Sequence, residues 1–224
     1  MSILKSFLFF LCAAAAAAIP VFLLWVDIHV FADDVPEISL TEIVQETLLG
    51  CIVVMHFWLA KKYDTQRYCN ILIGGFFLAM LIRELDSFFD LFFHGSWVWF
   101  ALFTSFLSLC RPLRHWNKTL AQLTHYTRTP YYGIMMSGLL CVLVFSRLFG
   151  MQFIWHAVLN DGYIRVLKNA IEECSESFGY VLCFMASAGS YCHFRAMARQ
   201  PAPVTRSHPQ PGNITTPASA SSAG

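Results

Sequence analysis

The segment NILIGGFFLAMLIRELDSFFDLFFH, residues 70–94, indicates a membrane helix that carries charged residues. Its uninterrupted apolar part, Ile71 to Ile82, would rise only about 18 Å as an α-helix, at about 1.5 Å per residue. The hydrocarbon core of a bilayer is about 30 Å thick, so a helix that crosses it here must also include the charged turns that follow. We therefore expect a membrane span over about residues 70–93 that takes ionisable side chains into the membrane.

The composition excludes an ordinary soluble domain, because 57% of the residues are hydrophobic and only 13% are charged. The apolar residues form long runs with polar breaks, which is typical of a polytopic helical membrane protein. The net charge of +1 and the lack of zinc-finger or phosphate-loop motifs give no indication of a nucleic-acid partner. The eight cysteines are scattered without a CxxC motif, so no disulfide framework is expected.

The sequence predicts an all-α protein, a bundle of six transmembrane helices formed by residues 1–199. The predicted spans are residues 7–26, 39–60, 70–93, 97–113, 131–149 and 170–194. The first span also resembles a secretory signal, so the bundle has five helices if that segment is cleaved. Between the spans, residues 114–130 are expected to form a basic loop and residues 151–168 a connection at the membrane surface. Residues 200–224, rich in Pro, Ser, Thr and Ala, are expected to be a disordered cytoplasmic tail.

The charged residues are divided between the two sides of the predicted membrane. All but one of the 14 acidic residues lie on one side, and 11 of the 15 Lys and Arg residues lie on the other. Because basic loops stay in the cytoplasm, this division places both termini inside the cell. We expect a multi-pass protein of the inner (plasma) membrane of a bacterium, with the acidic side facing outward.

Carboxylates are expected within the membrane on three of the predicted spans. Only 14 residues separate Glu46 from Lys61, so the second span must include Glu46 and extends toward Glu42. In the third span, Asp86, Asp90 and His94 follow one another at intervals of four residues and share a helix face. The carboxylates expected at this depth are Glu42, Glu46, Glu84, Asp86, Asp90, Glu172, Glu173 and Glu176. The cations expected beside them are Arg83, Arg147, Arg165 and Lys168.

These carboxylates outnumber the cations, and the excess requires protons, water or a metal ion. Carboxylate and imidazole ligands in a helical bundle are typical of a zinc, iron or manganese site. The predicted metal ligands are Asp90, His94, His156, Glu172 and Glu176. The predicted catalytic residues are Glu46 and Asp86, with Arg83 and Arg147 to hold an anionic head group. These residues lead to the hypothesis of a metal-dependent hydrolase that acts on a lipid or lipid-linked substrate.

Two other hypotheses fit the same residues. A carboxylate such as Glu46 or Asp86 could carry a proton in a proton- or cation-coupled transporter. Alternatively, the charges form a structural ion-pair network in a non-catalytic membrane scaffold, with Arg83 and Arg147 joining the helices. His56, in the second span, is expected to be a hydrogen-bonded histidine of the core and no metal ligand.

Overall fold

The computed structural model describes residues 3–30, 39–91, 93–159 and 165–199. This part of the chain is helical and contains no strand, which confirms the all-α prediction. The longer helices are α1 (Ile3–Val30), α2 (Leu40–Lys62), α3 (Arg67–Glu84), α5 (Trp97–Arg114), α6 (Trp116–Thr127), α7 (Pro130–Leu140) and α10 (Arg165–Arg199). The shorter ones are η1 (Asp64–Gln66), α4 (Asp86–Asp90), η2 (Cys141–Phe145), α8 (Ser146–Phe149) and α9 (Gln152–Leu159). The predicted tail, residues 200–224, lies outside the described residues.

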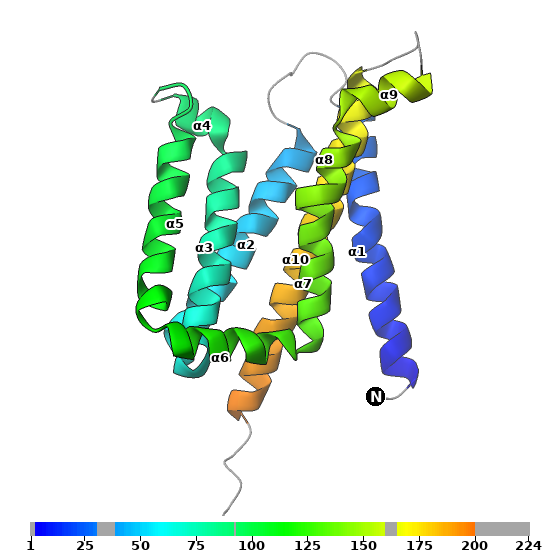
Figure 1. The fold of residues 1–224 in the computed structure, drawn as a ribbon. Helices are drawn as coiled ribbons and strands as arrows, with labels where there is room; N and C mark the ends of the chain where they lie inside the picture. Colours follow the sequence, from blue (N-terminus) through cyan, green and yellow to red (C-terminus); the bar gives the residue numbers. More distant parts are fainter. Residues whose placement is uncertain (1–2, 31–38, 92, 160–164, 200–224) are drawn as a thin grey trace, which may run out of the picture.

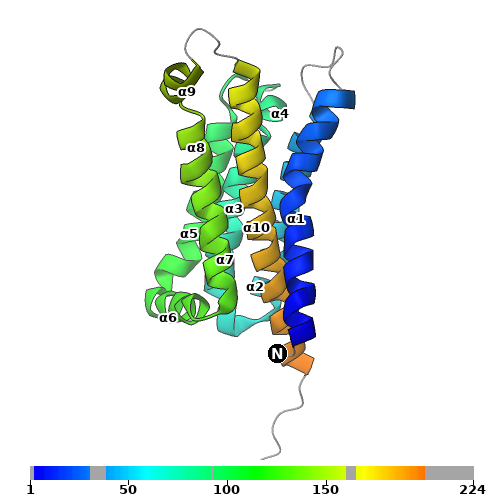
Figure 2. The same ribbon diagram turned by 90° about the vertical axis from the view of Figure 1, so that its right-hand side faces the viewer.

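The long helices run side by side and form a bundle (Figure 1). α2 packs against both α3 and α10, and these two pack in turn against α5 and α7. α1 lies along the outside of the bundle against α10 and α2, as Figure 2 shows. α6 lies across one end, where α1 begins and α10 ends, and we call this the α6 end. α4 and α9 lie at the opposite end, which we call the α4 end.

Four helical stretches in the described part of the chain are long and apolar enough to cross a membrane. They are Phe10–His29, Leu40–Lys62, Asp64–Glu84 and Pro130–Phe149. The other two predicted spans correspond to α5 and α10, which lie alongside these four (Figures 1 and 2). Both are more polar, because α5 ends with Arg111 and Arg114 and α10 carries glutamates near its start.

The third predicted span is interrupted, which corrects the expectation of one helix over residues 70–93. α3 ends at Glu84, and Leu85 leaves the helical region with ψ of 24° before the short α4 begins. The chain then turns at Gly95, whose φ of +77° is a conformation that favours glycine. The residues expected on one continuous polar face are thus divided between α4 and the turn after it. They are Asp86, Asp90 and His94.

The basic loop predicted over residues 114–130 is wrong, because most of it forms α6. The buried residues of this helix are Thr119, Gln122 and Tyr126, which lie on one face. Two of the three are polar, so hydropathy alone does not show the helix. Gln122 Oε1 accepts hydrogen bonds from the backbone N–H groups at the start of α3, at 2.8 and 3.1 Å. α6 therefore caps α3.

The core lies where α2, α3, α7 and α10 meet. Its fully buried side chains include Leu49, Ile52 and Phe77. α7 and α10 approach closely at two glycines, since a Cβ atom at Gly179 would lie 2.8 Å from the carbonyl oxygen of Gly138. Small residues allow helices in membranes to pack at such short distances.

Candidate functional site

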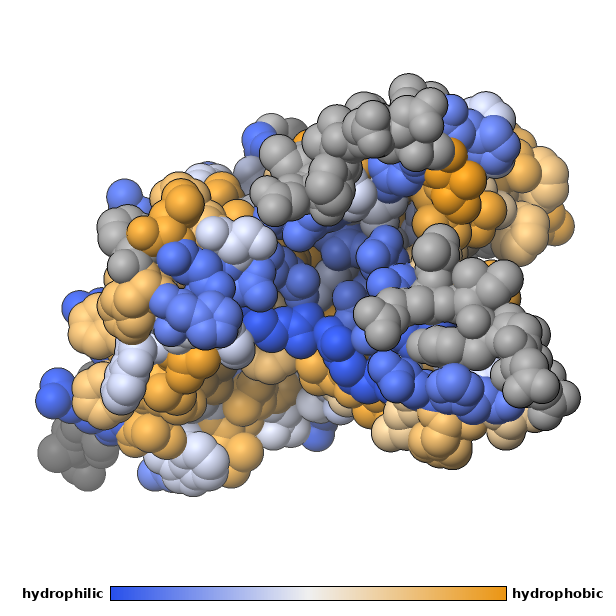
Figure 3. Space-filling view, turned by 90° about the horizontal axis from the view of Figure 1, so that it is seen from above, coloured by the Kyte–Doolittle hydropathy of each residue, from blue (hydrophilic) through white to orange (hydrophobic). Residues whose placement is uncertain are grey.

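A cavity of about 350 Å³ lies at the α4 end of the bundle, between the beginnings of α2 and α10 and the end of α3. Viewed from this end, hydrophilic side chains line a hollow in the centre of the molecule (Figure 3). The lining residues are Ser39, Thr41, Glu42, Gln45, Glu84, Asn169, Glu172, Glu173 and Glu176. Five of them are glutamates, and we call this the acidic cavity.

The first turn of α2 is held in place by two capping side chains. Ser39 Oγ accepts a hydrogen bond from the backbone N–H of Glu42 at 3.0 Å. Asp27 of α1 accepts hydrogen bonds from the backbone N–H groups of Leu40 and Thr41 at 2.8 and 3.0 Å. The N–H groups at a helix N-terminus have no partner within the helix, and oxygens of these side chains satisfy them. The caps therefore set the direction in which α2 leaves the cavity.

Gln45 joins α2 to α10 at the cavity. Its Nε2 donates to Ser177 Oγ at 2.7 Å and to the carbonyl oxygen of Glu173 at 3.3 Å. Gln45 is 5% exposed and Ser177 is 2% exposed, so this contact is buried. Breaking it would leave polar groups unsatisfied, and the contact therefore stabilises this pair of helices.

Arg147 forms ion pairs with two of the five glutamates. Its Nη1 lies 3.2 Å from Glu172 Oε1, and its Nη2 contacts Glu176. Lys168 Nζ lies 2.9 Å from the other oxygen of Glu172. Arg147 belongs to α8, which follows the π-helical turn η2. A π turn contains an extra residue and rotates the residues after it about the helix axis, and in this register Arg147 meets α10.

Glu84 is the third glutamate with a partner. Its carboxylate forms an ion pair with the adjacent Arg83 and accepts a hydrogen bond from the Tyr180 hydroxyl at 2.8 Å. Tyr180 is fully buried among α2, α3, α7 and α10. Glu84 therefore connects the acidic cavity with the core of the bundle.

The remaining two glutamates, Glu42 and Glu173, have no Lys or Arg within ion-pair distance in the described part of the chain. The other three carboxylates of the cavity are paired with three cations, Arg83, Arg147 and Lys168. When all of these groups are ionised, the side chains that the structure describes at the cavity have an excess of two negative charges. Such an excess in a partly enclosed site attracts cations.

The other predicted site residues do not line this cavity. Glu46 lies on α2, Asp86 and Asp90 lie on α4, His94 is in the turn after α4, and His156 is on α9. Asp90 Oδ2 lies 2.9 Å from His94 Nδ1, and the His94 side chain is 99% exposed. The structure thus brings together Glu172 and Glu176 with Arg147, as described above, while the Asp90–His94 pair is at the edge of the bundle beside α5.

Among the described residues, no group of three or more His, Cys, Asp and Glu side chains is placed to hold a metal ion. Two predicted ligands, Glu172 and Glu176, are engaged by Arg147, and two others, Asp90 and His94, contact each other. The zinc, iron or manganese site stays a prediction, and so does the hydrolase activity based on it.

Several residues that build the site were not predicted from the sequence. They are Asp27, Gln45, Asn169, Ser177 and Tyr180. A helical spacing rule could have found two of them. Gln45 follows Glu42 by three residues, and Tyr180 follows Glu176 by four, so each shares a helix face with a predicted carboxylate.

Comparisons of the chain with models of protein families, with curated proteins and with solved structures give no match. In its described part, the chain is a helical protein with four helices long and apolar enough to cross a membrane, and an acidic cavity at one end. The chemistry of that cavity is the basis on which function is inferred.

Proposed function

We propose that this chain is a multi-pass membrane protein that binds an organic cation in the acidic cavity, on the outer side of a bacterial inner membrane. The observation that carries the proposal is the charge of the cavity. Three of its five glutamates are paired with a Lys or Arg, and the other two have no such partner among the described side chains. A ligand with ammonium groups supplies the missing positive charge and donates hydrogen bonds to carboxylates.

The outside of the bundle supports a membrane location. Large apolar side chains cover it, including Phe103 and Phe106 of α5, which are 63% and 66% exposed. On α1, Phe10 and Phe22 are 65% and 61% exposed. Apolar surface of this extent is unfavourable in water and favourable against lipid. α5 and α10 lie alongside the four most apolar stretches, which are α1, α2, α3 and the continuous stretch α7–η2–α8. We therefore propose that all six of these cross the membrane.

The two ends of the bundle differ in charge, which supports an orientation. The acidic cavity lies at the α4 end, whereas basic residues gather at the α6 end. They are Lys61, Lys62, Arg67, Arg111, Arg114, Lys118, Arg128 and Arg195. By the positive-inside rule the α6 end faces the cytoplasm. The beginning of α1 and the end of α10 both lie there, so we place both termini inside the cell.

The size and lining of the cavity favour a small organic cation. Its volume of about 350 Å³ is within the range of small-molecule sites, roughly 300–1,000 Å³, and far larger than a bare ion. The two glutamates without a cationic partner, Glu42 and Glu173, come from different helices. Asn169 and Gln45 add amide groups to the same lining. An amine with two or more charged nitrogens therefore fits both the volume and the charge of the cavity.

Spermidine binding to the full-length protein in detergent tests this proposal. We expect spermidine to raise the melting temperature and to bind measurably in isothermal titration calorimetry. The double variant Glu42→Gln/Glu173→Gln should bind at least about tenfold more weakly, because each hydrogen-bonded charge pair contributes roughly 1.5–3 kcal/mol. Glu46→Gln is the matched control, since Glu46 is on the same helix but does not line the cavity.

Two outcomes would contradict the proposal. One is spermidine binding of equal strength in the double variant and in the wild type, and the other is no binding by the wild type. Elemental analysis of the purified protein tests the metal hypothesis separately. Stoichiometric zinc, iron or manganese that is lost in Asp90→Asn would replace the organic cation with a metal centre.

A further inference from the structure

His56 lies in the second half of α2 at a point where three helices meet. It is 1% exposed. Its Nδ1 lies 2.8 Å from Asn70 Oδ1 on α3, and its Nε2 lies 3.1 Å from Ser187 Oγ on α10. Both nitrogens of the ring therefore have a hydrogen-bond partner from a different helix.

The position of one proton on the ring follows from Asn70. Asn70 Nδ2 donates a hydrogen bond to the carbonyl oxygen of Gln66 at 2.8 Å, so the amide oxygen is the atom that faces His56. An amide oxygen only accepts hydrogen bonds, and His56 Nδ1 must therefore carry a proton. This leaves Nε2 as the nitrogen that can gain or lose one.

Ser187 can serve either state of Nε2. Its Oγ lies 2.8 Å from the carbonyl oxygen of Cys183 as well as 3.1 Å from His56 Nε2. When Nε2 is bare, the single hydroxyl hydrogen of Ser187 points to the ring. When Nε2 is protonated, its N–H donates to Ser187 Oγ, and the hydroxyl turns to the Cys183 carbonyl. Both states of His56 are then hydrogen-bonded at both nitrogens without movement of any heavy atom.

The groups around the ring are neutral. On the α3 side Gly74 packs against it, because a Cβ atom at Gly74 would lie 3.3 Å from His56 Cβ. On the α10 side the titratable Cys183 thiol faces the carbonyl oxygen of Met135, at 3.9 Å, and not the ring. Within the described residues, no Asp, Glu, Lys or Arg side chain forms a hydrogen bond or ion pair with His56. Burial among neutral groups favours the neutral ring, so the second proton is taken up only on acidification.

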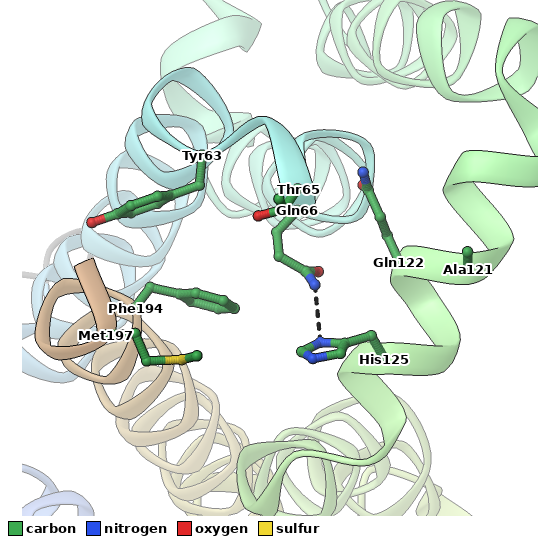
Figure 4. A pocket seen from close by; sticks show the side chains of 8 residues that line it. All are labelled: Tyr63, Thr65, Gln66, Ala121, Gln122, His125, Phe194 and Met197. Atoms are coloured by element: carbon green, nitrogen blue, oxygen red, sulfur yellow. Dashed lines mark hydrogen bonds between the residues drawn. The ribbon is translucent and has the colours of Figure 1, made fainter. Parts of the chain in front are cut away.

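A second cavity lies at the α6 end and shares Gln66 with the hydrogen bonds of this cluster. It has a volume of about 510 Å³ and is lined by Tyr63, Thr65, Gln66, Ala121, Gln122, His125, Phe194 and Met197 (Figure 4). Gln66 Nε2 points into it and lies 2.9 Å from His125 Nδ1. The same residue holds Asn70 through its carbonyl oxygen, so Gln66 separates the cavity from the His56 cluster by one helical turn.

We propose that His56, Asn70 and Ser187 form a proton-binding site inside the helix bundle, which is reached from the α6 end. The ligand is a single proton that adds to His56 Nε2 as the Ser187 hydroxyl rotates away. The site joins α2, α3 and α10, so the charge of the ring acts on the contact between these helices. This inference does not depend on the ligand of the acidic cavity.

Nitrogen NMR of the full-length protein with ¹⁵N-labelled histidine tests the site directly. The signals of His56 are those missing from His56→Gln. We expect a protonated Nδ1 and a bare Nε2 at high pH, and protonation of both on acidification while circular dichroism shows an intact fold. A ring that keeps its bare Nε2 until the protein unfolds would overturn the proposal, as would a proton on Nε2 with none on Nδ1 at high pH.

Two variants test the role of the hydroxyl. Ser187→Ala removes the acceptor of the charged N–H and should lower the midpoint of His56 protonation by about one pH unit, a tenfold loss of proton affinity. Ser190→Ala, a buried serine one turn further along α10, should leave it unchanged. An unchanged midpoint of His56 protonation in Ser187→Ala would refute the proposed role of the Ser187 hydroxyl. If Ser187→Ala does not fold, Asn70→Asp tests the site instead. A carboxylate beside Nδ1 should raise the midpoint of His56 protonation, and an unchanged midpoint would refute the site.

Discussion

Replacing Arg147 with alanine tests whether ion pairs hold the acidic cavity together. Arg147 pairs with Glu172 and Glu176, and Glu172 keeps a second partner in Lys168. The carboxylate that loses its cation is therefore that of Glu176, whose side chain is 9% exposed. We expect Arg147→Ala to lower the free energy of unfolding, because a carboxylate with little access to water is left unpaired.

The magnitude follows from the exposure of the two partners. Removing one member of a buried ion pair costs about 3–5 kcal/mol, and an exposed pair contributes at most about 1 kcal/mol. The Arg147 side chain is 43% exposed, so solvent partly screens its ion pair with Glu176. The free-energy cost of removing Arg147 therefore lies between these two limits. We expect a loss of about 2 kcal/mol. For a chain of this size the melting temperature should fall by roughly 4–8 °C.

Thermal unfolding in detergent, followed by circular dichroism, measures this change. Arg67→Ala is the matched control, because Arg67 is 42% exposed but its partner Asp64 is 79% exposed. It should lose less than about 1 kcal/mol. Adding Glu176→Gln to Arg147→Ala removes the unpaired charge and should restore most of the stability. Equal losses of stability in the two arginine variants, or no recovery of stability in the double variant, would show that the Arg147–Glu176 ion pair does not stabilise the bundle.

Two further predictions concern packing and orientation. A methyl group at Gly179 lies 2.8 Å from the Gly138 carbonyl oxygen, so Gly179→Ala should lower the stability in detergent by about 1–3 kcal/mol. Gly133→Ala, where a Cβ atom meets nothing within 4 Å, should not, and equal effects would contradict the close packing of α7 and α10. The proposed orientation predicts that alkaline phosphatase fused after Leu159 is active and that the same enzyme fused after Arg199 is inactive. The reverse pattern would invert the topology.

Helices with apolar runs between clear boundaries could be located from the sequence. The helix predicted over residues 39–60 is observed as Leu40–Lys62, and that over residues 97–113 as Trp97–Arg114. The prediction that His56 is a hydrogen-bonded histidine of the core is confirmed, because it is buried and has two hydrogen-bond partners. α6 was missed because its buried face is polar, and the end of α3 was missed because a break at Leu85 leaves no sign in hydropathy.

The candidate site could be predicted only in part. Counting the residues needed to cross a bilayer grouped eight carboxylates at one depth, and five of the glutamates line the acidic cavity. Depth in the membrane does not distinguish Glu42 from Glu46, or Glu84 from Asp86, because it contains no information on direction around a helix axis. Such directions depend on which helices pack together.

Hydropathy and charge are properties of local segments. The helical class and the division of charge between the two ends could therefore be predicted without the structure. The tertiary structure decided which charged groups meet. Arg147 contacts Glu176 only because a π turn rotates α8 toward α10, and Asp27 caps α2 only because α1 packs beside it. Likewise, the His56 site requires one residue from each of α2, α3 and α10. Contacts between residues far apart in the chain depend on packing, which no local pattern contains.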